Sequence, residues 1–157
     1  MTGSASSSQA AGAPDALPRR PGPLYVAMGV VLLEALVLLG SAVAFLVMSG
    51  TGGELGTSLI ALCVMFAILG IGLLVVVRSL WSMHRWSRPA TIAWQLLQAL
   101  FGISTFGGGP LLAAAAIVPA VACVIALFTP SVIRAFDVSI AYYMAHPSAP
   151  APPPKRW

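Results

Sequence analysis

The sequence predicts an all-α membrane protein with four transmembrane helices and both termini in the cytoplasm. Three observations predict this class. Hydrophobic residues make up 59% of the chain and charged residues only 8%, whereas soluble domains carry about 25% charged residues. Four apolar runs are each long enough to cross a hydrocarbon core of about 30 Å. All eight basic residues lie outside these runs. Because successive segments between spans lie on opposite sides of a membrane, all eight fall on the same side.

Residues 1–22 are expected to form a disordered N-terminal tail. They are rich in Ser, Ala, Gly and Pro and contain few large apolar side chains besides Leu17. Such a composition cannot bury enough surface to offset the entropy lost on ordering. The first span then covers residues 24–48, which are apolar except for Glu34. Ser, Thr and Gly at residues 49–53 predict a break and a short loop.

The second and third spans are predicted at residues 57–77 and 90–106. The second is followed by Arg78. Pro89 precedes the third, and proline is tolerated in the first turn of a helix, where its missing N–H has no partner to lose. The third run is the least hydrophobic of the four, because hydroxyl and amide side chains interrupt it. Three glycines at residues 107–109 are expected to close it.

The fourth span is predicted at residues 111–128 and completes a four-helix transmembrane domain over residues 23–130. Pro119 lies near the middle of this span. A proline there removes one backbone hydrogen bond, so we expect it to kink the helix. Small residues around it allow close approach of a neighbouring helix.

Two segments are expected after the membrane domain. In residues 131–145, Val132, Phe136 and Tyr143 recur at helical spacing, which predicts an amphipathic helix lying in the membrane interface. Residues 146–157 are rich in proline and alanine and are expected to form a disordered, solvated tail.

The basic residues predict the orientation. Arginine and lysine in short loops stay cytoplasmic, and here both termini and the middle loop carry them while the other two loops hold only Glu54. A multi-pass plasma-membrane protein with both termini cytoplasmic follows. Cleavage of the first span as a signal peptide near residues 42–44 is an alternative, disfavoured because the run is long and contains Glu34. The eight basic residues on which the orientation rests are Arg19, Arg20, Arg78, Arg85, Arg88, Arg134, Lys155 and Arg156.

Glu34 is the charged residue predicted to lie inside a span, about 15 Å from its inner end. An acid at this depth is costly and is a candidate functional residue. Gln98 on the third span has a similar depth, and Gln95 lies one turn closer to the cytoplasm on the same face. We therefore expect one intramembrane polar contact among these three residues. Two interpretations stay open: a proton-titrating or cation-binding site, or a neutral acid that holds two helices together.

The middle loop is a second candidate site. If the helix continues through residues 78–88, Arg78, Arg85 and Arg88 fall near one face and form a basic patch for anionic lipid headgroups at the cytoplasmic side. Setting the topology is the simpler role for these residues, and docking of an acidic partner is the other alternative. The basic residues lie between apolar segments rather than on a folded face, which argues against nucleic acid as a partner.

No metal site, cofactor or catalytic group is predicted. Cys63 and Cys123 should differ in depth by about 10 Å, too far for a disulfide. His84 and His146 lack further ligands at metal-binding spacing. Both outer loops are too short to assemble a nucleophile, a base and an oxyanion donor, so we do not expect an enzyme.

Three sequence blocks carry a resemblance. Residues 85–90, 94–98 and 32–36 together make the chain resemble small four-helix integral membrane proteins of actinobacteria, over about residues 24–135. That family is uncharacterised, so the resemblance implies a topology and a source, with no activity. The chain is also similar to small multidrug-resistance exporters, which have four short helices and one acid in the first helix. The similar residues are Tyr25 and Glu34. The basic residues of this chain are more strongly confined to one side of the membrane than in those exporters.

The sequence thus predicts a small multi-pass membrane protein of unknown activity that serves as a structural, accessory or regulatory subunit. Its expected partners are the lipid bilayer and either another membrane protein or further copies of itself. The alternative is a proton-coupled exporter of small molecules that uses Glu34.

Overall fold

The computed structural model describes residues 18–50 and 53–146, and every regular element within them is an α-helix. This confirms the all-α class. The predicted tails lie mainly outside the described residues. Five helices follow one another along the chain: α1 (Gly22–Ser49), α2 (Gly53–Trp81), α3 (Ser87–Ser104), α4 (Pro110–Leu127) and α5 (Pro130–Ala145).

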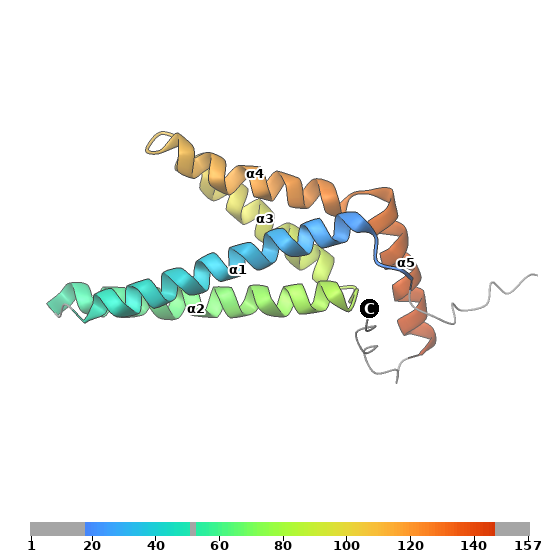
Figure 1. Ribbon diagram of the computed structural model, residues 1–157, viewed down its shortest axis with the longest axis horizontal. Coiled ribbons are helices and arrows are strands. Elements are labelled where there is room, and N and C mark those ends of the chain that lie inside the picture. Colours follow the sequence, from blue (N-terminus) through green and yellow to red (C-terminus); the bar gives the residue numbers. More distant parts are fainter. Residues whose placement is uncertain (1–17, 51–52, 147–157) are drawn as a thin grey trace, which may run out of the picture.

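The first four helices form two antiparallel hairpins (Figure 1). The α1/α2 hairpin and the α3/α4 hairpin lie close together at the end that carries α5, and they diverge toward their loops. We call the α5 end the inner end. Within the described residues, three helices are long and apolar enough to cross a membrane: α1, α2 from Leu55 onward, and α4.

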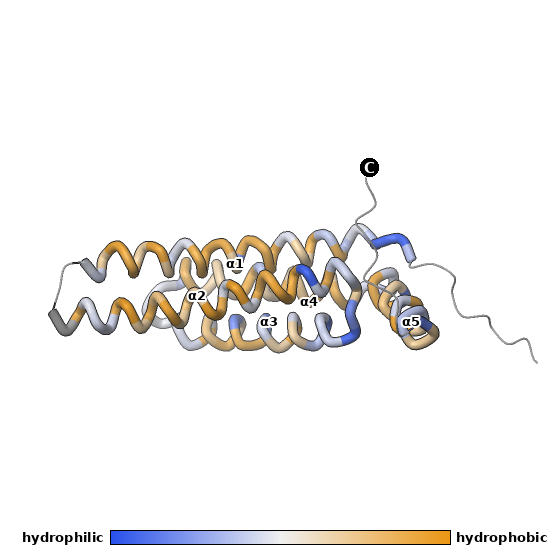
Figure 2. Tube along the Cα trace, turned by 90° about the horizontal axis from the view of Figure 1, so that it is seen from below, coloured by the Kyte–Doolittle hydropathy of each residue, from blue (hydrophilic) through white to orange (hydrophobic). Residues whose placement is uncertain are grey.

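Apolar surface dominates the outside of this assembly. Figure 2 shows hydrophobic residues along most of the length of the hairpins. Leu55, Val47 and Leu111 are 76%, 75% and 84% exposed, and many other large apolar side chains are also exposed. Monomeric soluble proteins rarely expose contiguous apolar patches larger than a few hundred Å². The three apolar helices and this surface indicate a membrane protein.

Close backbone approach joins the helices within each hairpin. A Cβ on Gly70 of α2 would lie 2.7 Å from Cγ of Leu39 on α1. A Cβ on Gly102 of α3 would lie 2.6 Å from Cγ1 of Ile117 and 3.1 Å from the carbonyl oxygen of Ala113, both on α4. Only glycine fits at these two contacts without a shift of its neighbours. Small residues therefore set the helix spacing in both hairpins.

Pro119 lies inside α4, which continues as one helix from Pro110 to Leu127. The proline therefore does not interrupt the helix, and the kink expected at Pro119 stays a prediction. Ala116 and Ala120, on either side of Pro119, are buried, and this buried small-residue face lets α4 pack against its neighbours.

The inner end of α2 closes with a Schellman motif, a common helix stop with a left-handed residue. The N–H of His84 donates to the carbonyl of Ser79, and the N–H of Met83 donates to that of Leu80. Met83 has φ = 50°, a conformation that L side chains other than Asn and Asp rarely adopt. Its side chain is nonetheless almost fully buried. The helical continuation considered for residues 78–88 is wrong, because α2 ends at Trp81.

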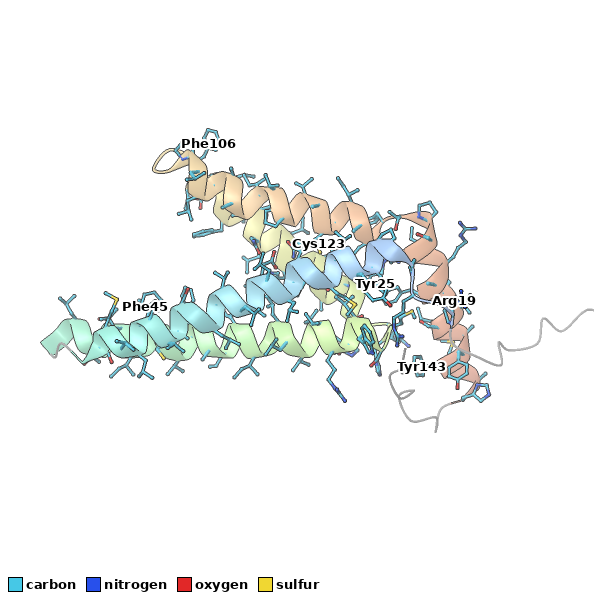
Figure 3. The ribbon with its side chains drawn as sticks, viewed as in Figure 1. Arg19, Tyr25, Phe45, Phe106, Cys123 and Tyr143 are labelled. Atoms are coloured by element: carbon cyan, nitrogen blue, oxygen red, sulfur yellow. The ribbon has the colours of Figure 1, made fainter. Side chains whose placement is uncertain are left out.

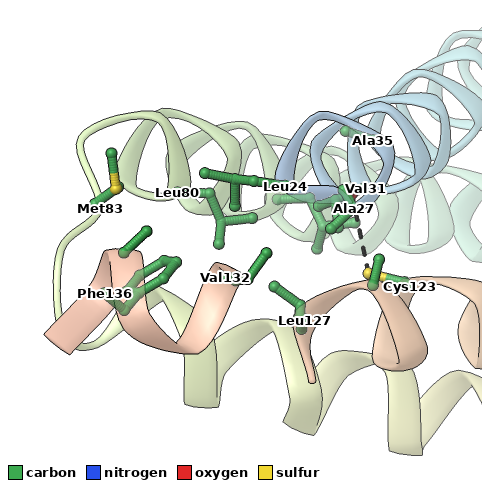
Figure 4. Close-up of a cluster of buried hydrophobic side chains, with 13 residues drawn as sticks. Leu24, Ala27, Val31, Ala35, Leu80, Met83, Cys123, Leu127, Val132 and Phe136 are labelled. Carbon is green, nitrogen blue, oxygen red and sulfur yellow. Dashed lines mark hydrogen bonds between the residues drawn. The ribbon is translucent and has the colours of Figure 1, made fainter. Parts of the chain in front are cut away.

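Helix α5 crosses the inner end of the hairpins and buries its apolar face against them (Figures 1 and 4). Val132 and Phe136 join a core cluster with Leu24, Leu127 and Met83. The face that the sequence assigned to the membrane interface is thus covered by protein. The location of α5 at the headgroup level stays a prediction.

Hydrogen bonds from α5 recognise the turn that ends α2. Ser139 Oγ donates to the carbonyl of Met83 at 3.1 Å, and the Tyr143 hydroxyl donates to that of Ser82 at 3.0 Å. Tyr143 also stacks on His84, with ring centroids 5.4 Å apart. Figure 3 shows Tyr143, Arg19 and Tyr25 together at this end. The turn at residues 82–86 therefore positions α5 on the bundle.

Candidate functional site

The candidate site is a polar contact between the two hairpins, centred on Glu34 of α1. Trp94 Nε1 of α3 donates to Oε2 of Glu34 at 2.9 Å. Gln95 Nε2 donates to the same oxygen at 3.0 Å and to Oε1 at 3.3 Å. Consecutive residues of one helix thus supply two donors to one carboxyl group. The contact joins α1 to α3 through side chains alone.

Gln95 is the most deeply placed member of this contact. Its side chain is fully buried, whereas Glu34 is only partly buried. The Gln95 amide nitrogen is occupied by the carboxyl group of Glu34. Its carbonyl oxygen Oε1 is also buried, but it has no hydrogen-bond partner in the described part of the chain. Half of this buried amide is therefore satisfied and half is not.

Gln98 occupies a different position from the one expected. Its depth suggested that it would be the main partner of Glu34, but its Nε2 donates to the carbonyl of Ala116 on α4 at 3.4 Å. It remains near enough to Glu34 to interact with the carboxyl group more weakly. The expected contact among Glu34, Gln95 and Gln98 is present, but Gln95 rather than Gln98 is its main amide donor, because equal depth alone does not bring side chains together.

Trp94 is the site residue that the sequence reasoning missed. Tryptophan near the end of a span is commonly an anchor at the membrane boundary, which leaves its N–H unassigned. A partly buried indole N–H also needs an acceptor, and Glu34 is the acidic side chain predicted inside a span. The need of the Trp94 N–H for an acceptor and of Glu34 for a donor could have predicted this contact from the sequence.

Cys123 of α4 also lies near the polar contact around Glu34. It is fully buried, and its Sγ is 3.9 Å from the carbonyl oxygen of Ala27 on α1 (Figure 4). It is also near enough to Glu34 for the two groups to interact electrostatically. Both Cys123 and Cys63 are free thiols. Across residues 18–50 and 53–146, no group of three or more His, Cys, Asp or Glu side chains could hold a metal ion.

The basic residues of the middle loop differ in exposure. Arg78 and Arg85 are exposed, whereas Arg88 is partly buried. The guanidinium carbon of Arg88 lies 5.6 Å from the ring centroid of Phe128 and 6.0 Å from that of Phe136. Its Nε is buried without a hydrogen-bond partner. Arg88 therefore packs on the rings between α4 and α5, while the other two arginines face outward.

Arg20 adds a contact at the inner end that was not foreseen. Its Nε donates to the carbonyl of Trp81 at 3.1 Å, and its guanidinium carbon lies 4.3 Å from the centroid of the Trp81 ring. The segment before α1 is thereby held to the end of α2.

Comparison of the chain with protein-family models, curated proteins and solved structures gives no match. The polar contact around Glu34 and the inner end are thus the features on which a function can be proposed.

Proposed function

We propose that the chain is a polytopic membrane protein with four spans and both termini cytoplasmic, and that it works as a structural, accessory or regulatory subunit rather than as an enzyme. The proposed location is the plasma membrane of an actinobacterium, in line with the resemblance given above. The observation that carries the subunit role is that the Glu34 carboxyl group accepts from two donors of α3, so the intramembrane acid serves to join the two hairpins.

The two faces of α3 support its assignment as a span in addition to α1, α2 and α4. Its polar residues Thr91 and Gln95 are fully buried. Its outer face is apolar, with Leu96, Leu100 and Ile103 each more than 60% exposed. The low average hydropathy of α3 therefore comes from residues that face protein. Its 18 residues are close to the minimum length of a membrane span.

The geometry of the ends supports the proposed orientation. The N-terminus of α1, the C-terminus of α2, the N-terminus of α3 and α5 all lie at the inner end (Figure 1). Arg20, Arg85 and Arg134 are therefore on one side of the helices, and basic residues favour the cytoplasmic side. Exposed Arg78 and Arg85 are the proposed contacts for anionic headgroups, each worth about 1 kcal/mol near such a surface.

Site-directed labelling tests the four-span topology. Cys63 and Cys123 are first replaced by alanine, and single cysteines are then placed at Arg85 and Gly108. A membrane-impermeant maleimide applied to intact cells should label position 108 only, and position 85 should react only after the membrane is opened. Labelling of both positions from outside would contradict the proposed topology.

A proton-coupled exporter is the second candidate, because the Glu34 side chain is only partly buried. Reconstitution in liposomes separates the two functions. A subunit should show no substrate-dependent proton flux and should retain a membrane-protein partner, or further copies of itself, on purification in mild detergent. Flux that disappears in Glu34→Gln would replace the subunit proposal with the exporter.

A further inference from the structure

A hollow between α3 and α4 lies beside the buried amide of Gln95. Its volume is about 200 Å³, and it is open on one side. Leu96 and Ala99 of α3 and Val121 and Val124 of α4 form its walls. Gln95 is the single polar residue among the seven that line it. The hollow therefore combines an apolar wall with one deeply buried amide.

The free atom of this amide is a hydrogen-bond acceptor. Both donors that surround Glu34 point toward the carboxyl group, so Nε2 of Gln95 is the atom committed there. Oε1 is left buried without a partner in the described part of the chain, and an unsatisfied buried acceptor destabilises the protein. A group that donated to Oε1 would recover this loss. The acceptor thus points to a ligand that carries an O–H or N–H.

The surroundings restrict what that ligand can be. A buried water needs two to four polar partners, and the lining of the hollow offers one polar side chain. Acyl chains of ordinary lipids fit the apolar walls but carry no donor. An apolar cavity of about 150 Å³ holds benzene, so a hollow of about 200 Å³ suits a molecule slightly larger than benzene.

We propose that this hollow binds a lipid-soluble molecule of one-ring size, such as a phenol or an indole, whose O–H or N–H donates to Oε1 of Gln95. The ring contacts the walls formed by Leu96, Ala99, Val121 and Val124, and the donor group reaches the amide. The site does not depend on the subunit role proposed above, because it uses the atom of Gln95 that the contact with Glu34 leaves free.

A pair of matched probes tests the donor. The full-length protein in detergent micelles is titrated with 4-fluorophenol and, separately, with 4-fluoroanisole, which has a similar ring but no O–H. Binding is followed by the fluorine resonance of the probe, with empty micelles as the partition control. Loss of one hydrogen bond worth about 1.4 kcal/mol raises the Kd about tenfold. The phenol should therefore bind in a saturable manner and about tenfold more tightly than the anisole.

Three variants complete the design. Gln95→Leu removes the acceptor and should abolish the preference for the phenol. Val124→Phe fills the hollow while keeping Gln95, and should abolish binding of both probes. Val118→Phe makes the same change at a position of α4 that is 65% exposed and does not line the hollow, so it should bind like the unchanged protein.

Equal affinity for the two probes, or a preference for the phenol that persists in Gln95→Leu, would overturn the proposal. So would the absence of saturable binding, which is the result expected if a helix of a neighbouring molecule fills the hollow. If Gln95→Leu does not fold, Val124→Phe and Val118→Phe still decide whether the hollow is the binding site, and the two probes on the unchanged protein still decide whether a donor is required.

Discussion

The two hairpins differ in the contacts between their own helices and in the side chains with which each contacts the other hairpin. The α1/α2 hairpin is long, with helices of 28 and 29 residues, and its helices contact each other mainly through apolar and small side chains. The α3/α4 hairpin has two helices of 18 residues, and α3 carries a buried polar face. Hydrogen bonds from the second hairpin specify how the two hairpins meet.

This difference assigns separate roles to packing and to hydrogen bonding. Close packing at Gly70 and Gly102 sets how near the helices of one hairpin approach each other. Donors that converge on one carboxyl group fix one register, since Trp94 and Gln95 reach Glu34 together only when α3 is placed as observed. The hydrogen bonds to Glu34 of α1 therefore position α3, and with it the second hairpin, relative to the first.

The largest expected effect is Gly102→Ala in the second hairpin. The new Cβ would lie 2.6 Å from Cγ1 of Ile117 and 3.1 Å from a backbone oxygen of Ala113, so part of α4 must move. Overpacking of this kind costs about 1–3 kcal/mol. The free energy of unfolding in mixed micelles measures it.

Gly70→Ala makes the same change in the first hairpin and should cost less. Its closest neighbours are atoms of the Leu39 side chain, which can change rotamer. Gly29→Ala, where nothing lies within 4 Å, is the control and should not destabilise. If Gly70→Ala proved more harmful than Gly102→Ala, the first hairpin would be the more tightly fitted of the two.

A smaller effect is expected from the contact between the hairpins. Hydrogen bonds between membrane helices average about 0.6 kcal/mol and reach about 1.7 kcal/mol. Gln95→Leu should fall toward the upper end of this range, because its nitrogen is shared between both oxygens of Glu34. Trp94→Phe should cost about the average. A double-mutant cycle with Glu34→Gln, read from unfolding free energies, isolates the coupling.

Gln98→Leu is the matched comparison and should show weaker coupling to Glu34, since the Gln98 amide is directed to the Ala116 carbonyl. Coupling as strong as that of Gln95 would mean that the hairpins meet in a different register from the one described.

The smallest effect concerns the link between α5 and the first hairpin. Tyr143→Phe removes one hydrogen bond to the Ser82 carbonyl, worth about 0.5–1.5 kcal/mol. Exposure of a cysteine placed at Ser139, which is fully buried, reports release of α5. A labelling rate unchanged by Tyr143→Phe would show that apolar packing alone holds α5.

The pH dependence of the same contact has a definite sign. Burial, and secondarily Tyr142, raises the pKa of Tyr143, while Arg20 opposes this shift. A pKa raised in the folded state means that folding favours the neutral hydroxyl. Its contribution is complete below the ordinary tyrosine pKa of about 10 and is lost as the pH rises through the raised value. Labelling at position 139 should accelerate in that alkaline range, and less so in Tyr143→Phe.

The sequence predicted the elements better than their contacts. Runs of apolar residues locate helices because every backbone group in hydrocarbon must be bonded within its own segment. The observed bounds of α1 and α4 are therefore close to the apolar runs around Glu34 and Pro119. Where α2 ends was missed, because a Schellman motif normally has glycine at the left-handed position, and here that residue is Met83.

The candidate site could be predicted only in part. An acid inside an apolar run must find a partner, and glutamines on another span are suitable donors, so Glu34 and Gln95 were both named from the sequence. Choosing between Gln95 and Gln98 required the crossing angle of the hairpins. That angle arises from contacts of α1 with α4 and of α2 with α3, which no local pattern encodes. Of the three arginines predicted to form a basic patch, Arg88 packs on the rings of Phe128 and Phe136, and the headgroup contact of Arg78 and Arg85 stays a prediction.

The unequal helix lengths bear on the choice of membrane. At about 1.5 Å per residue, α1 is about 42 Å long and α3 about 27 Å. Under the four-span topology proposed above, helices of about 42 Å exceed a hydrocarbon core of about 30 Å and would tilt, whereas helices of about 27 Å nearly match it. Such mismatch costs fractions of a kcal/mol per ångström. A thicker bilayer would reduce the tilt of the first hairpin and would have to thin locally around the second, so the angle at which the hairpins diverge should respond to lipid chain length.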